Sequence, residues 1–134
     1  MNETIQALLL FSAWFVLLSL GMAVYRTALV QRGRPANAFA PNGSDLPGFG
    51  QRLTRARDNC FETLALFAAI ALGASVLGRF DVTDGLALWL LGARVGQSVV
   101  HLVSTSVPAV LLRAGLFFAQ LFIYAWWLWR LLAG

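Results

Sequence analysis

The chain has 134 residues, of which 59% are hydrophobic and only 12% are charged. Soluble domains carry roughly 25% charged residues, so this composition argues against a soluble protein and favours a membrane protein. All ten basic residues are arginine, and the net charge is +4. We do not expect nucleic-acid binding, because most arginines gather in one loop between apolar segments and not on the face of a soluble fold.

Four apolar segments follow one another along the chain, at approximately residues 5–30, 59–77, 86–105 and 109–129. Each is close to the ~20 residues with which a helix crosses the hydrocarbon core. Strands of a membrane barrel would be shorter and would alternate in polarity. The first segment follows Asn2 and Glu3 and is too long for a cleaved signal peptide, so we expect it to be a true span.

The connections between these segments differ in length. The first, from about residue 31 to 54, is polar and contains Pro35, Pro41 and Pro47, whereas the other two are short. Short connections make consecutive helices antiparallel neighbours. The predicted fold class is therefore all-α, an integral membrane four-helix up-down bundle that forms a single domain over residues 1–134.

The arginines are distributed unevenly between the two sides of the bundle. One other loop carries Arg79 and the carboxyl end carries Arg130, whereas the first loop and its flanks carry Arg26, Arg32, Arg34, Arg52, Arg55 and Arg57. Because basic loops stay in the cytoplasm, we expect the first loop there. With four spans, both termini would then lie on the opposite side, which is the periplasm if the membrane is a bacterial inner membrane.

Polar residues inside the spans recur at helical spacing. Arg55, Asn59 and Glu62 lie at positions i, i+4 and i+7 and share one helix face. Polar residues of the other spans also share a helix face. They are Arg94, Gln97, Ser98 and His101 in the third span, and Arg113 and Gln120, seven residues apart, in the fourth. A charge inside the membrane is costly, so such groups face the bundle interior or a wet cavity.

Two interpretations of these polar residues remain open. They form either a structural network of ion pairs or one shared cavity that opens to the cytoplasm and holds a ligand. The single Glu62 cannot balance three arginines, so the surplus positive charge favours an anionic ligand. Cys60 is the only cysteine and provides neither a disulfide nor a metal site. We expect it to be a packing residue.

The string Arg55-Ala56-x-x-Asn59-x-x-Glu62 resembles the signature of the MAPEG family, the membrane-associated proteins in eicosanoid and glutathione metabolism. Ala93-Arg94 in the third span and Arg113-Ala114-Gly115 in the fourth resemble two further elements of that family. The resemblance extends over the whole chain. It implies a homotrimer that binds glutathione between subunits near the cytoplasmic side, most similar to prokaryotic microsomal glutathione transferases.

The resemblance also implies roles for individual residues. Arg113 would be catalytic by stabilising the glutathione thiolate. Glutathione, as cosubstrate, would be bound by Arg55, Asn59, Glu62, Arg94 and His101, with Glu62 pairing with its ammonium group. An arginine near the end of the first span also contacts glutathione in the family, and either Arg32 or Arg34 is a candidate. The second substrate would be a lipophilic electrophile or lipid hydroperoxide.

The site has further candidate elements and one departure from the family. Aromatic residues of the fourth span would line an entry for a lipophilic substrate or face lipid, and residues 37–45 would cap the site or form a solvated turn. Family members often have Tyr seven residues after the third-span arginine, where this chain has His101. This departure favours a second hypothesis, a non-catalytic protein that binds a lipid or a partner subunit. A small transporter is disfavoured, because no broken helix or inverted repeat is visible.

Overall fold

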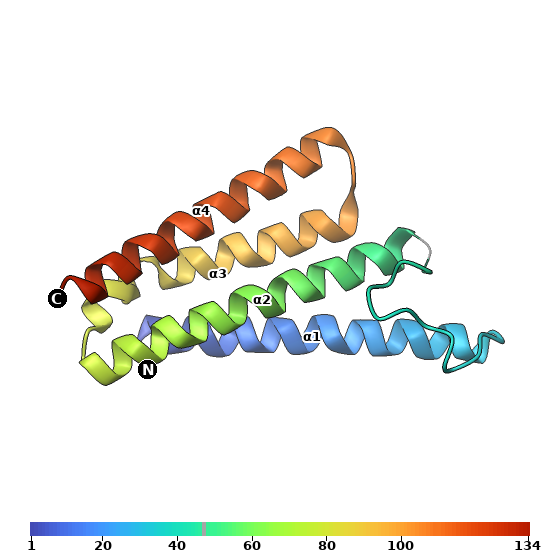
Figure 1. The fold of residues 1–134 in the computed structure, drawn as a ribbon, viewed down its shortest axis with the longest axis horizontal. Helices are drawn as coiled ribbons and strands as arrows, with labels where there is room; N and C mark the ends of the chain where they lie inside the picture. The colour runs from blue at the N-terminus through green and yellow to red at the C-terminus, as the bar shows by residue number, and fades with distance from the viewer. Residues whose placement is uncertain (47) are drawn as a thin grey trace.

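The computed structural model describes residues 1–46 and 48–134, and this part of the chain folds into four long helices (Figure 1). The helices are α1 (Glu3–Gln31), α2 (Gly48–Leu77), α3 (Phe80–Val103) and α4 (Val107–Leu132). Consecutive helices run antiparallel, and both termini lie at the same end of the bundle. Pro47, one of the three prolines counted in the first loop, lies outside the described residues.

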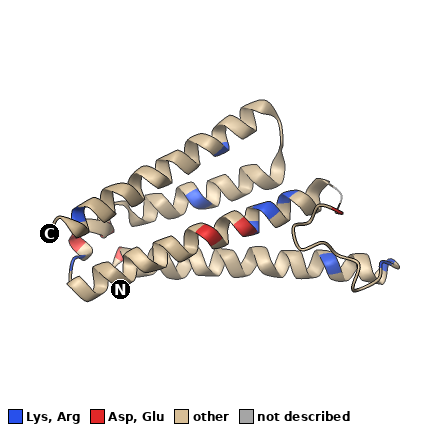
Figure 2. Cartoon of the chain, viewed as in Figure 1, with Lys and Arg blue, Asp and Glu red and all other residues tan. Residues whose placement is uncertain are grey.

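The all-helical prediction is confirmed, and all four helices are long and apolar enough to cross a membrane. Helix α2 begins well before residue 59, where the sequence predicted the second span to start. The arginine-rich segment around Arg52 therefore forms the first turns of this helix and not part of a loop, and Figure 2 shows basic residues gathered at this end of α2. Arginine, leucine and alanine are strong helix formers, so a polar helical extension beyond the apolar span is physically reasonable.

The outer surface of the bundle is strongly apolar. Large side chains point outward along its length, including Val76, Trp89 and Phe122, which are 86%, 75% and 75% exposed. Soluble monomers rarely expose extended apolar surface of this kind, whereas the hydrocarbon core of a bilayer favours it. The chain is therefore an integral membrane protein.

Aromatic side chains fill the half of the bundle that lies near the termini. The rings of Phe11 and Phe67 meet edge-on with centroids 5.7 Å apart, and Phe67 lies 5.8 Å from Trp127. Tyr124 packs against the same tryptophan, and all four side chains are buried. This packing joins α1, α2 and α4 at one end, whereas the buried Arg94, Gln97, Ser98 and His101 follow later on α3, towards the other end.

The start of α1 is anchored to the start of α3. The backbone N–H of Thr4 donates to Oδ1 of Asp84 at 2.9 Å, and the Thr4 hydroxyl donates to the same oxygen at 2.5 Å. The Thr83 hydroxyl lies 2.6 Å from that of Thr4. The first N–H groups of a helix lack partners inside it, so an acceptor from a neighbouring helix stabilises both the helix end and the pairing of the two helices.

The first loop folds back on α2. Asp45 forms an ion pair with Arg34 and accepts a hydrogen bond from the backbone N–H of Ala40 at 3.2 Å. Gly43 has φ of +71°, and a Cβ at this position would lie 2.6 Å from Oγ1 of Thr54 on α2. Only glycine suits this backbone conformation and this close approach. The loop is therefore held against the polar end of α2.

Candidate functional site

Arg94 lies inside the bundle on α3 and is completely buried. Its Nε donates a hydrogen bond to Oε1 of Gln120 on α4 at 3.0 Å. Its Nη1 and Nη2 are also buried, and they have no hydrogen-bond partner in the part of the chain that the structure describes. A buried guanidinium with two unpartnered nitrogens is costly unless a further acceptor reaches it.

The side-chain amide of Gln120 also donates two hydrogen bonds. Its Nε2 donates to Oε1 of Gln97 at 2.8 Å and to the backbone oxygen of Leu116 at 3.0 Å. Both glutamines are buried. A chain of hydrogen bonds thus runs from Arg94 through Gln120 to Gln97, and it fixes the relative rotation of α3 and α4 in a region where few other polar groups are available.

Gln97 is also part of the wall of a cavity of about 340 Å³ between α2, α3 and α4. The cavity is lined by Arg55, Asn59, Gln97, His101, Val110, Arg113, Ala114 and Phe117. Figure 1 shows α4 separating from α3 towards the connection at residues 104–106, which is the end where these residues lie. The structure therefore brings together four of the predicted site residues on three helices.

The cavity has the electrostatic character of an anion site. Arg55 and Arg113 contribute two guanidinium groups, and none of the described lining residues is acidic. The Nε of Arg113 and the Nδ1 of His101 are buried without a hydrogen-bond partner among the described residues. Arginine pairs with carboxylates in a planar, two-pronged geometry, so this wall suits a ligand that carries carboxylate groups.

Arg94 and Glu62 are predicted site residues that do not line the cavity. Arg94 is connected to the wall through the hydrogen bonds of Gln120 and Gln97. Glu62 is exposed on the outer surface of α2, next to the exposed Phe61. The described part of the chain therefore leaves the Glu62 side chain uncovered.

A second polar cavity adjoins the first through Arg55. It also has a volume of about 340 Å³ and is lined by Asn42, Ser44, Gln51, Arg55 and Asp58. Asn42 and Ser44 belong to the loop segment 37–45, for which the sequence allowed either a cap over the site or a solvated turn. Their position beside Arg55 gives the loop a direct contact with the approach to the site.

Neither of the two arginines considered near the end of α1 lines the cavity. Arg34 forms the ion pair with Asp45, and its Cζ lies 4.6 Å from the centroid of the Phe39 ring. Arg32 is exposed at the end of α1. Among the aromatic residues of α4, Phe117 lines the cavity, whereas Phe118 and Phe122 point outward.

Two residues of the polar network were absent from the predicted site. Gln97 lies one turn from Arg94 on the predicted polar face of α3, and that spacing was a signal that it belongs to the site. Gln120 shares a stripe of α4 with Arg113. Its pairing with Arg94 depends on the rotation of α4 against α3, which spacing along one helix does not specify.

The comparisons with known proteins identify a family for this chain. The model of the MAPEG family matches residues 4–133, which is nearly the whole chain. Neither a curated protein nor a solved structure matches the chain. The family match covers all four helices, including α2 with its Arg55, Asn59 and Glu62 and α4 with Arg113. The chain belongs to the MAPEG family.

Proposed function

We propose that the chain is a glutathione-dependent membrane transferase or peroxidase for lipophilic electrophiles, of the prokaryotic microsomal glutathione transferase type. The observation that carries this proposal is the cavity inside an apolar bundle whose described lining holds two arginines, an amide and an imidazole but no carboxylate. Glutathione carries two carboxylates, and its reactive form is a thiolate. Membership of the MAPEG family is consistent with this ligand.

The polar wall suits the binding of glutathione. Arg55 is positioned to pair with a carboxylate, and Asn59 and His101 offer hydrogen bonds beside it. Arg94 supports the wall through the Gln120 and Gln97 amides and keeps two buried nitrogens free for an acceptor. We assign these residues to binding and positioning.

Arg113 is our candidate for the catalytic residue. A guanidinium beside the thiol favours the charged thiolate over the thiol, because it interacts with the negative sulfur. In a conjugation, the thiolate sulfur forms a bond to the electrophilic carbon, the leaving group departs with its bonding pair, and the thiol proton is released to water. Val110, Ala114 and Phe117 provide an apolar wall next to Arg113 for the second substrate.

The exposed Glu62 supports an assembly of several chains. A carboxylate on the outer surface of a span is costly in lipid, and a neighbouring subunit could cover it and contribute cationic groups. We propose a homotrimer in which Glu62 meets the ammonium group of glutathione at a subunit boundary. We place it in a bacterial inner membrane with the arginine-rich loop in the cytoplasm and both termini in the periplasm.

His101 favours a second candidate function. It is 7% exposed and stands where family members often have Tyr. An imidazole can donate a hydrogen bond as a phenol does, but its geometry and charge differ. In this second function, the protein keeps the bundle and the cavity but binds a lipid or a partner subunit without catalysis.

Kinetics of the Arg113→Leu variant separate these functions. The detergent-purified protein should conjugate glutathione to a lipophilic aryl halide. If Arg113 stabilises the thiolate, Arg113→Leu should lower kcat by roughly 100-fold, with a smaller change in the KM for glutathione. No turnover by a folded wild-type protein that binds glutathione would favour the non-catalytic function. An equal loss of binding and turnover in the variant would make Arg113 a binding residue.

A further inference from the structure

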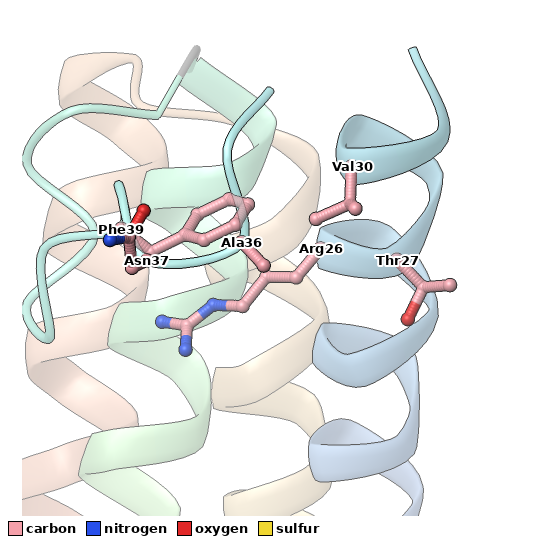
Figure 3. A pocket seen from close by; sticks show the side chains of 6 residues that line it. All are labelled: Arg26, Thr27, Val30, Ala36, Asn37 and Phe39. Atoms are coloured by element: carbon pink, nitrogen blue, oxygen red, sulfur yellow. The ribbon is translucent and has the colours of Figure 1, made fainter. Parts of the chain in front are cut away.

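A third cavity lies apart from the candidate glutathione site, between the end of α1 and the first loop. It has a volume of about 430 Å³ and is lined by Arg26, Thr27, Val30, Ala36, Asn37 and Phe39. Figure 3 shows Arg26 extending from α1 towards Phe39 and Asn37 of the loop. None of these residues lines the cavity between α2, α3 and α4.

Among the described residues, the guanidinium of Arg26 forms no salt bridge. Its Nε and Nη2 are buried and make no hydrogen bond to the described residues. The carboxylate of Asp45, in the same loop as Phe39, pairs with Arg34 and accepts from the backbone N–H of Ala40. Buried charged donors are normally paired, so the arrangement around Arg26 fits an anionic ligand that the chain itself does not supply.

The loop holds this guanidinium in place. The Cζ of Arg26 lies 5.6 Å from the centroid of the Phe39 ring, and the Cζ of Arg34 lies 4.6 Å from the same centroid. Two cations thus share one aromatic ring, which stabilises both electrostatically. This concentrates positive charge at the cavity while leaving the hydrogen-bonding edge of Arg26 free for an oxyanion.

We propose that this cavity binds the phosphate of an acidic phospholipid headgroup. The position on α1 favours a lipid over a phosphate dissolved in water. Thr27 and Val30 line the cavity and lie on the same face of α1 as Val16, Leu20 and Ala23, which precede them at helical spacing. All five side chains are exposed. An acyl chain can lie along this apolar line while its headgroup reaches Arg26 at the membrane boundary.

The surrounding charge selects acidic over zwitterionic headgroups. The Arg34 guanidinium lies against the Phe39 ring that lines the cavity, so the positive charge next to the headgroup comes from Arg26 and Arg34. Arg32 is exposed outside the cavity. Basic groups next to the membrane attract acidic lipids and would repel the quaternary ammonium of a choline headgroup. Phosphatidylglycerol should therefore bind more tightly than phosphatidylcholine.

Lipid binding to the intact protein can be measured by native mass spectrometry after release from detergent, with phosphatidylglycerol or phosphatidylcholine added. We expect Arg26→Gln to weaken phosphatidylglycerol binding by roughly fivefold or more. The matched control Arg32→Gln removes the same charge from an exposed position outside the cavity and should change binding by less than about twofold. Val30→Glu keeps Arg26 but places a carboxylate on the exposed rim of the cavity. This negative charge should repel the lipid phosphate and also weaken phosphatidylglycerol binding.

Several results would overturn the inference. If Arg26→Gln and Val30→Glu bind phosphatidylglycerol as the wild type does, the cavity is not a lipid site. If Arg32→Gln loses as much affinity for phosphatidylglycerol as Arg26→Gln, the lipid is attracted by the general positive charge of the surface and not by the cavity. Displacement by inorganic phosphate would identify a soluble ligand. Equal binding of phosphatidylcholine would contradict selection of acidic headgroups. Loss of glutathione binding in Arg26→Gln, with lipid binding intact, would assign Arg26 to the glutathione site instead.

Discussion

Gln120 on α4 accepts a hydrogen bond from Nε of Arg94 on α3 at 3.0 Å, and both side chains are completely buried. This contact joins two helices through the one hydrogen bond that the Arg94 guanidinium makes among the described residues. A hydrogen bond to a buried charge contributes more than one between neutral groups, and losing it leaves the charge unsatisfied. Gln120 is therefore expected to control where Arg94 lies.

Replacing Gln120 by Leu should destabilise the protein by about 2 kcal/mol, because the guanidinium of Arg94 loses its acceptor. Thermal unfolding followed by circular dichroism in detergent measures this effect. Gln120→Glu keeps an acceptor oxygen for Arg94 and balances its charge, although it loses the Nε2 donor to Gln97 and Leu116; it should lose less stability than Gln120→Leu. Equal destabilisation by both substitutions would show that the Nε2 hydrogen bonds and the packing of the amide, and not its contact with Arg94, determine the effect.

The contact between Thr4 and Asp84 should contribute measurably to the pairing of α1 and α3. Asp84→Ala removes the acceptor of two hydrogen bonds at the start of α1, at an expected cost of about 1 kcal/mol. In a double-mutant cycle with Thr4→Val, the two substitutions should cost less together than the sum of the single effects. Strict additivity of the unfolding free energies would contradict a direct contact.

Glu62→Gln should weaken glutathione binding by about tenfold if Glu62 pairs with the ammonium group at a subunit boundary. Titration calorimetry on the purified variant measures this change. Native mass spectrometry should show the same trimer for the variant and the wild type. The matched control Asp58→Asn removes a nearby carboxylate that pairs with Arg57 and should leave affinity almost unchanged. Unaltered affinity of Glu62→Gln in an intact trimer would remove Glu62 from the site.

The arginine-rich first loop should face the cytoplasm. In a Cys60→Ala background, Asn42→Cys should react with a membrane-impermeant maleimide only after the cells are lysed. A cysteine added after Gly134 should react in intact spheroplasts, because the carboxyl terminus is expected on the other side. The reverse labelling pattern would invert the proposed topology. The background substitution is mild, because Cys60 is small and buried and alanine fills most of its volume.

The helices of the bundle could be predicted from the sequence, because each apolar run has the length that a membrane requires. The cavity could be predicted in part. Arg55 and Asn59 line it together, as one turn of helix implies, and His101 and Arg113 reach it from α3 and α4. Helical spacing indicates that Arg55 and Asn59 share a face, whereas His101 and Arg113 were assigned to the site by the family resemblance.

Other contacts depend on how separate helices and the loop are oriented relative to one another, which the spacing of residues along one helix does not determine. Glu62 shares a face with Arg55 in the sequence, but it lies farther along α2 and is exposed there. The partner of Arg94 is set by the rotation of α4 against α3, and the partner of Arg34 by the fold of the loop. Contacts between separate elements were therefore the part that sequence patterns left undetermined.

Equilibrium binding of glutathione to the detergent-purified wild-type protein tests the central claim most directly. The account predicts saturable binding accompanied by the ultraviolet absorbance of a thiolate at neutral pH, and loss of that absorbance in Arg113→Leu. Absence of binding to a folded, homogeneous protein would contradict the claim. It would mean that the arginine-lined cavity between α2, α3 and α4 serves another anion.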